Sequence, residues 1–166
     1  MLKNKLNIFL LVSFLLAVSI TVWLDYKVKD NVGDIAFNDK IDNPDFKVCN
    51  ENNIFQYYSS KSNYQNGRKE IEKELHETIK ELTFEKSGLI TFRFIINCNG
   101  ETGRFRLKGV NTELKDTKFD SEKLQILQNA VQNLKNWRIV TYNNKTNDSY
   151  FVLNFKVEQC KITDVF

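Results

Sequence analysis

The hydrophobic positions of this chain form one continuous run near the N-terminus, followed by stretches in which apolar and polar residues recur with helical or strand periods. No charged residue interrupts the run from Ile8 to Leu24. A helix needs roughly 17 to 25 predominantly apolar residues to cross the hydrocarbon layer of a membrane. Residues 1–24 are therefore predicted to be a signal anchor, which is a transmembrane helix that stays in the mature protein.

The residues at the two ends of this run predict its orientation. Lys3 and Lys5 precede the run, and Trp23 lies near its far end. Basic residues favour the cytoplasmic side of a membrane and Trp favours the interface, so the rest of the chain is expected outside the cytoplasm. A cleaved signal peptide remains an alternative, because Ala17 and Ser19 provide a small-x-small cleavage site that would leave a mature chain beginning at Ile20.

Residues 25–66 are polar and show no apolar period longer than a turn. Gly33 and Pro44 interrupt the segment, which is typical of a tether between an anchor and a folded domain. A tether of about 40 residues could reach roughly 130 Å when fully extended. A cluster of aromatic residues is predicted to mark where the chain first packs on the folded domain: Phe55, Tyr57, Tyr58 and Tyr64.

Two amphipathic helices are predicted in the domain, which is assigned to residues 67–160. Residues 68–82 carry apolar side chains at a spacing of three or four, which places them on one helix face. A second helix is expected after Asp120 or Ser121, either of which can cap it, and it should end near Trp137. The apolar positions of the two helices are Ile71, Leu75, Ile79 and Leu82, then Leu124, Leu127, Val131 and Leu134.

Three strands complete the predicted domain, at about residues 89–97, 102–110 and 150–157. The first alternates strictly, and the pair Asn99-Gly100 after it predicts a hairpin with a type I′ turn. In the second strand, Phe105 and Leu107 should point inward and Arg104, Arg106 and Lys108 outward. The fold class is α+β, with a three-stranded antiparallel sheet of order 2-1-3 and two helices on one face. The last strand would be an edge of the sheet, and residues 161–166 a tail.

Residues 67–157 resemble the C-terminal domain of TonB-like proteins, in particular a short form found in Bacteroidetes. The resemblance rests on the helix before Leu82-Thr83-Phe84, on the strand that runs into Asn97-Cys98-Asn99-Gly100-Glu101, on the helix ending in Trp137, and on the closing strand that ends in Phe155. It implies a periplasmic domain, tethered to the inner membrane, that binds other envelope proteins and performs no catalysis.

The resemblance also implies a site and partners. A short segment of an outer-membrane receptor, or of another envelope protein, would add to the sheet beside the last strand, and an ExbB/ExbD-type motor could use this link for energised transport. The partner-binding residues would be Tyr150, Phe151, Val152, Leu153, Asn154, Phe155, Lys156 and Val157. An accessory envelope protein without a motor remains the alternative, because residues 7–24 contain no histidine and no Pro-rich spacer follows them.

Composition and motifs argue against other classes of function. The net charge is only +3, from 24 basic and 21 acidic residues mixed along the chain, so no nucleic-acid partner is expected. The chain lacks a glycine-rich phosphate loop and the common hydrolase motifs, and its one histidine, His76, is predicted to be a surface residue. We expect no catalytic residue, cofactor or metal.

Three cysteines raise the question of a disulfide. Cys49, Cys98 and Cys160 are spaced too widely for a local metal site. In the predicted sheet, Cys98 and Cys160 lie at opposite ends of neighbouring strands, beyond the roughly 6 Å between Cα atoms that a disulfide allows. Cys49 with Cys98 is the least unlikely pair.

Overall fold

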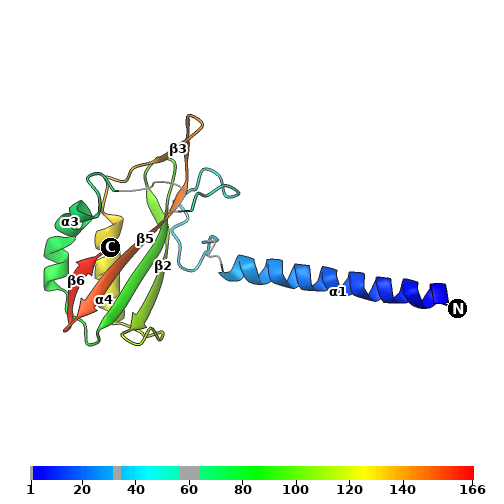
Figure 1. Ribbon diagram of the computed structural model, residues 1–166. Coiled ribbons are helices and arrows are strands. Elements are labelled where there is room, and N and C mark those ends of the chain that lie inside the picture. Colours follow the sequence, from blue (N-terminus) through cyan, green and yellow to red (C-terminus); the bar gives the residue numbers. More distant parts are fainter. Residues whose placement is uncertain (1, 32–34, 57–63) are drawn as a thin grey trace. The chain divides into compact units, whose positions relative to one another are not determined.

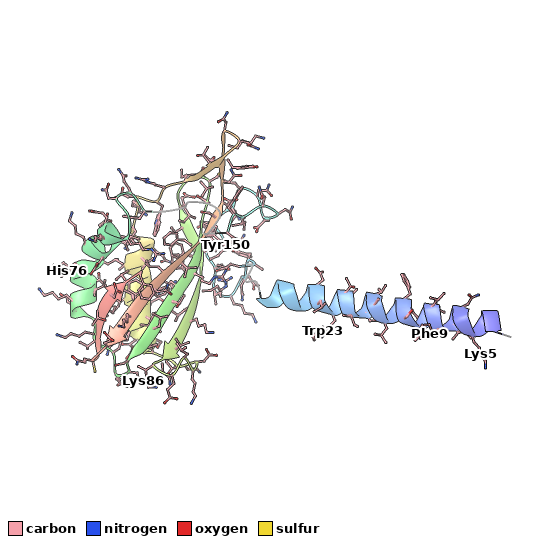
Figure 2. All side chains as sticks on the ribbon, viewed as in Figure 1. Lys5, Phe9, Trp23, His76, Lys86 and Tyr150 are labelled. Carbon is pink, nitrogen blue, oxygen red and sulfur yellow. A yellow bond between two sulfur atoms is a disulfide. The ribbon has the colours of Figure 1, made fainter. Side chains whose placement is uncertain are left out.

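The computed structural model describes residues 2–31, 35–56 and 64–166, which fall into two compact units, Met1–Ala36 and Phe37–Phe166 (Figure 1). The first unit contains helix α1 (Leu2–Asn31). Its stretch Asn7–Asp25 has a mean hydropathy of 2.3 and is long and apolar enough to cross a membrane. The side chains of Phe9 and Trp23 stand out from this helix and are exposed (Figure 2).

The second unit is an α+β domain built on an antiparallel sheet. Its strands follow the order β2-β1-β5-β6, and β3 and β4 form a separate hairpin. The helices are α3 (Arg68–Glu81) and α4 (Ser121–Gln132); the strands are β1 (Gly88–Ile96), β2 (Thr102–Asn111), β3 (Val140–Tyr142), β4 (Lys145–Asn147), β5 (Ser149–Glu158) and β6 (Lys161–Val165).

Both predicted helices of the domain are present and bury their apolar stripes on the same face of the sheet (Figure 1). The carboxylate of Asp120 accepts the backbone N–H groups of Glu122 and Lys123 and so caps α4, as expected. This helix ends at Gln132, five residues before the predicted end at Trp137. The indole of Trp137 is buried and donates to the carbonyl of Leu134, so the residue belongs to the core beyond the helix.

Aromatic rings fill the centre of the core. Phe94 has no exposed surface, and its ring centroid lies 4.6 Å from that of Phe105, 5.4 Å from that of Trp137 and 5.6 Å from that of Phe151. Tyr64 of the predicted aromatic cluster is buried against Trp137, and Phe55 is half-buried; Tyr57 and Tyr58 lie outside the described residues.

The sheet has four strands, and the predicted three-stranded sheet is wrong in this detail. Residues 161–165, predicted as part of a tail, form β6 and pair with the C-terminal half of β5. The turn between the two strands consists of Gln159 and Cys160, with φ angles of 48° and 69°. Glycine, asparagine and aspartate favour this left-handed conformation, so the sequence carries no recognisable hairpin signal at this point.

The hairpin between β1 and β2 is present, but its turn is not type I′. Gly100 has a φ of 82°, whereas Asn99 has no positive φ. A type I′ turn requires positive φ at both central residues. Arg104 lies where the pairing of β1 with β2 shifts register, and its φ of 53° marks a bulge that the alternation of side chains does not predict.

Candidate protein-binding edge

The strand predicted to bind a partner, β5, lies inside the sheet. It pairs with β1 along its length, and residues 155–158 pair with β6 on the other side. Asn154 and Phe166 exchange two backbone hydrogen bonds, of 2.7 and 2.9 Å, and the N–H of Tyr150 donates to the carbonyl of Phe55. The prediction that residues 150–157 form an edge is therefore wrong, because β6 and Phe55 occupy most of the side that faces away from β1.

The true edge on this side, β6, lies against other parts of the domain. The N–H of Phe84 donates to the carbonyl of Cys160, and Thr83 forms a bridge with Lys161. Helix α3 runs beside β6 (Figure 1), and a hollow of about 270 Å³ between them is lined by both apolar and charged side chains. His76, predicted to be a surface residue, is exposed on α3 and borders this hollow (Figure 2).

The opposite edge, β2, is open at its centre. At one end of β2, the N–H of Asn111 donates to the carbonyl of Lys115, and the carbonyl of Gly109 accepts from the N–H of Thr117. The peptide groups of every second residue of β2 therefore point away from β1. Leu107, two residues from Gly109, continues this series. Within the described residues, neither its N–H nor its carbonyl pairs with a segment beyond this edge.

A groove lies beside this open part of β2. Leu107 is opposite Phe92 in the sheet, so its side chain lies on the helix-covered face, where it is 45% exposed. The hollow has a volume of about 230 Å³ and a mainly apolar lining. We call it the β2 groove, and its lining residues are Ile90, Leu107, Gly109, Thr117, Lys118, Phe119 and Leu124.

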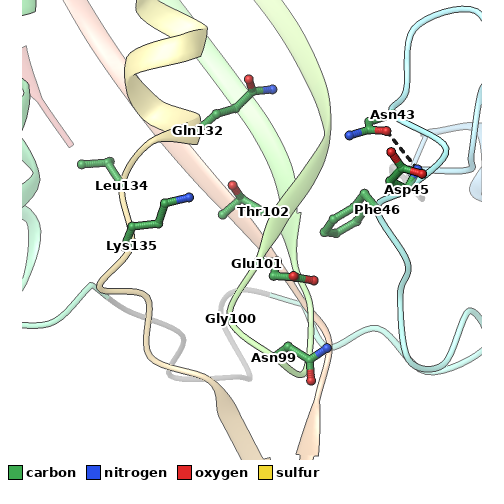
Figure 3. A pocket seen from close by; sticks show the side chains of 10 residues that line it. All are labelled: Asn43, Asp45, Phe46, Asn99, Gly100, Glu101, Thr102, Gln132, Leu134 and Lys135. Carbon is green, nitrogen blue, oxygen red and sulfur yellow. Dashed lines mark hydrogen bonds between the residues drawn. The ribbon is translucent and has the colours of Figure 1, made fainter.

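A second hollow, of about 460 Å³, opens at the turn between β1 and β2. Figure 3 shows its walls: the segment of Asn43, Asp45 and Phe46 on one side, and the C-terminal end of α4 with Gln132 on the other. Its lining is mostly polar. Phe46 packs against Gly103 so closely that a Cβ there would lie 2.3 Å from the ring, so this glycine is needed for the contact.

The segment from Asp42 to Phe55 packs on the domain, although the sequence assigns it to the tether. Asp148 is 1% exposed, and its carboxylate accepts the backbone N–H groups of Cys49, Asn50 and Cys98 at 2.7 to 2.9 Å. A disulfide joins Cys49 to Cys98, with 6.1 Å between their Cα atoms, which confirms the preferred pairing. Cys160 is free and exposed.

This cluster also has the composition of a metal site. Cys49, Cys98 and Asp148 bring possible ligand atoms within 4.8 Å of one another. A metal is bound by thiolates, however, and the two sulfurs are bonded to each other. The oxidised cluster thus offers only a carboxylate, and that group is already bonded to three N–H groups. The disulfide and the hydrogen bonds of Asp148 hold Cys49 and Asn50 against the end of β1.

Two ion pairs fasten the same segment to β2. Arg106 donates from both Nη atoms to the carboxylate of Asp42, at 2.7 and 2.8 Å, and Arg104 binds both carboxylate oxygens of Glu51. These hydrogen bonds lower the pKa of Asp42 and of Glu51 and raise the pKa of Arg104. The predicted outward arginines therefore hold the chain's own segment.

The lowered pKa of Asp42 predicts that acid weakens the domain. Asp42 binds a proton less readily when folded than when unfolded, so its contribution to stability is present above its unfolded pKa of about 4 and is lost as the pH falls through the folded pKa. Asp42→Asn should lower the melting temperature at pH 7 and flatten its decline between about pH 5 and pH 3. Asp45→Asn is the control, because Asp45 is exposed; equal pH profiles for the two variants would contradict the assignment.

No family model, curated protein or solved structure matches this chain. Several residues that the sequence analysis singled out attach residues 42–55 to the sheet. Cys49 of this segment is bonded to Cys98, and Arg104 and Arg106 form ion pairs with carboxylates of the segment. The structure adds two features that the sequence did not indicate: the buried acceptor Asp148 and the open edge at Leu107.

Proposed function

We propose that this chain is a single-pass inner-membrane protein whose domain lies in the periplasm and binds an extended segment of another envelope protein by β-strand addition, as TonB-like domains do. The apolar span of α1 and the lysines before it support the anchor and its orientation. The disulfide between Cys49 and Cys98 supports an oxidising compartment, since cytosolic thiols are kept reduced.

The observation that carries the proposal is the open edge at Leu107. A strand edge offers N–H and carbonyl groups to any extended chain, and neighbouring pockets select the side chains of that chain. Addition beside residues 150–157 would require β6 and Phe166 to leave β5, whereas β2 is already open at Leu107, between Gly109, which pairs with Thr117, and Gly103, which contacts Phe46. We therefore place the partner at β2.

The accessory role, without a motor, is favoured by the short connection to the membrane. The apolar span ends at Asp25 and the compact domain begins at Phe37, twelve residues later. Twelve residues reach at most about 43 Å, a third of the tether that the sequence predicts. The domain would then act close to the membrane that holds it. Purification with an ExbB/ExbD-type partner after detergent extraction would instead support energised transport.

A proline at position 107 tests the mechanism. Leu107→Pro removes an N–H that points away from the sheet, a change that edge strands tolerate, so the domain should stay folded with a loss of about 1 kcal/mol or less. It should reduce the partner recovered with the full chain, after chemical crosslinking of intact cells, to background. Leu107→Thr is the matched control, since it also shortens the side chain but keeps the N–H, and it should retain more of the partner than the proline variant. Equal recovery by a folded proline variant would refute strand addition at β2.

A further inference from the structure

The side chains in and around the β2 groove indicate the chemistry of the segment that the groove binds. This inference rests on the proposed function. We propose that the partner is an extended segment in which apolar residues alternate with acidic ones, and that it pairs with β2 around Leu107. The two faces of β2 present different chemistry at this point, and a strand added beside it would place successive side chains against each face in turn.

The apolar half of the pattern follows from the helix-covered face. A side chain of the added strand on this face lies next to Leu107 and above Phe119 and Leu124 of the β2 groove. These side chains are only partly buried in the free domain. An aliphatic side chain placed there removes apolar surface from water, which stabilises the complex.

The acidic half follows from the charges at the rim. Lys108 pairs with Thr91 in the sheet, which places it on the face opposite the groove, and its side chain is 68% exposed. Asp116 lies 3.5 Å from it, in an exposed pair that contributes little. Lys118 lines the groove and makes no ion pair with any carboxylate in the described part of the chain. The acidic side chains of an alternating strand would lie on the face opposite the groove and would complement Lys108, whereas Lys118 lies on the groove side.

The same charges argue against a second copy of this chain as the occupant. Two β2 edges paired antiparallel around this point would bring Lys108 of one copy near Lys108 of the other, since Arg106 is already paired with Asp42. Like charges directly opposite one another destabilise a strand pair. An acidic partner removes this repulsion, so a different chain fits the edge better than a copy of this one.

Defined peptides test the proposal. The probes are two capped nine-residue peptides, one that alternates valine with glutamate and one that alternates valine with lysine, and the full chain is held in lipid nanodiscs with empty nanodiscs as background. Fluorescence anisotropy should show roughly twofold tighter binding of the glutamate peptide, as one exposed ion pair would provide. The variant Lys108→Glu should reverse the preference, and Leu107→Pro should abolish binding of both peptides.

Three outcomes would overturn this inference: equal affinity for the two peptides, a preference that survives the charge reversal at Lys108, or self-association through β2 that Leu107→Pro removes. Failure of the inference can be told from failure of the proposed function. If Leu107→Pro still abolishes capture of the cellular partner while the peptides show no preference, strand addition stands and the predicted partner chemistry is wrong. If the proline variant captures the partner normally, the function itself is wrong.

Discussion

Replacing Asp148 with alanine is expected to destabilise the domain by about 3 to 5 kcal/mol, a large fraction of the stability of a domain this size. The carboxylate accepts three backbone N–H groups: those of Cys49 and Asn50 on one oxygen and that of Cys98 on the other. Each N–H left without an acceptor in a buried site costs about 1 to 3 kcal/mol. Loss of Asp148 should therefore loosen the chain around the disulfide as well as lower the stability of the whole domain.

The measurement is thermal or denaturant unfolding of the full chain in detergent micelles, followed by near-ultraviolet circular dichroism of its aromatic residues. Asp148→Asn should be intermediate, because an amide keeps one acceptor oxygen and the carboxylate has two. Asp45→Ala is the matched control on the same segment, with an exposed carboxylate, and should change stability by about 0.5 kcal/mol or less. An Asp148→Ala variant as stable as this control would contradict the role assigned to the buried carboxylate.

Replacing Phe94 with alanine is expected to cost about 3 to 5 kcal/mol for a different reason. The ring has no exposed surface and contacts Phe105, Trp137 and Phe151, which come from β2, from the segment after α4 and from β5. Its removal leaves a cavity at the point where these three parts meet. Because packed aromatic rings cannot collapse into such a space without leaving their preferred rotamers, most of the lost contact energy is not recovered.

Phe166→Ala provides the comparison, measured in the same unfolding experiment. Phe166 is 38% exposed, and its contacts with β5 include two backbone hydrogen bonds to Asn154 that an alanine retains. We expect a loss of about 1 kcal/mol or less for this variant. If Phe94 lies at the centre of the core, Phe94→Ala should lose much more stability than Phe166→Ala. Similar losses would show that Phe94 is not at the centre.

Much of the fold could be predicted from local patterns, since those patterns have direct physical causes. The period of Ile71 and Leu75 requires a helix that buries one face, and the alternation from Ile90 to Ile96 requires a strand with one apolar side. The preference for Cys49 with Cys98 followed from the positions of strand ends, and the structure contains this bond. These predictions depend only on residues near one another in the chain or in a simple hairpin.

The errors share a different cause. The hairpin between β5 and β6 turns through Gln159 and Cys160 at positive φ angles, although neither residue type favours this conformation. The attachment of residues 42–55 depends on Asp148, almost 100 residues away from Cys49. Long-range polar contacts of this kind leave no periodic signal, so the sequence alone assigned this segment to a tether and the open edge to β5.

The central claim, that the partner adds to the sheet at β2, can be tested by position-specific photo-crosslinking in intact cells. A photoreactive residue would replace Leu107 on β2, Lys156 on β5 or Thr163 on β6, one position at a time in the full chain. We predict a crosslinked partner from position 107 and none from positions 156 and 163. Crosslinks from 156 or 163, with none from 107, would contradict the account.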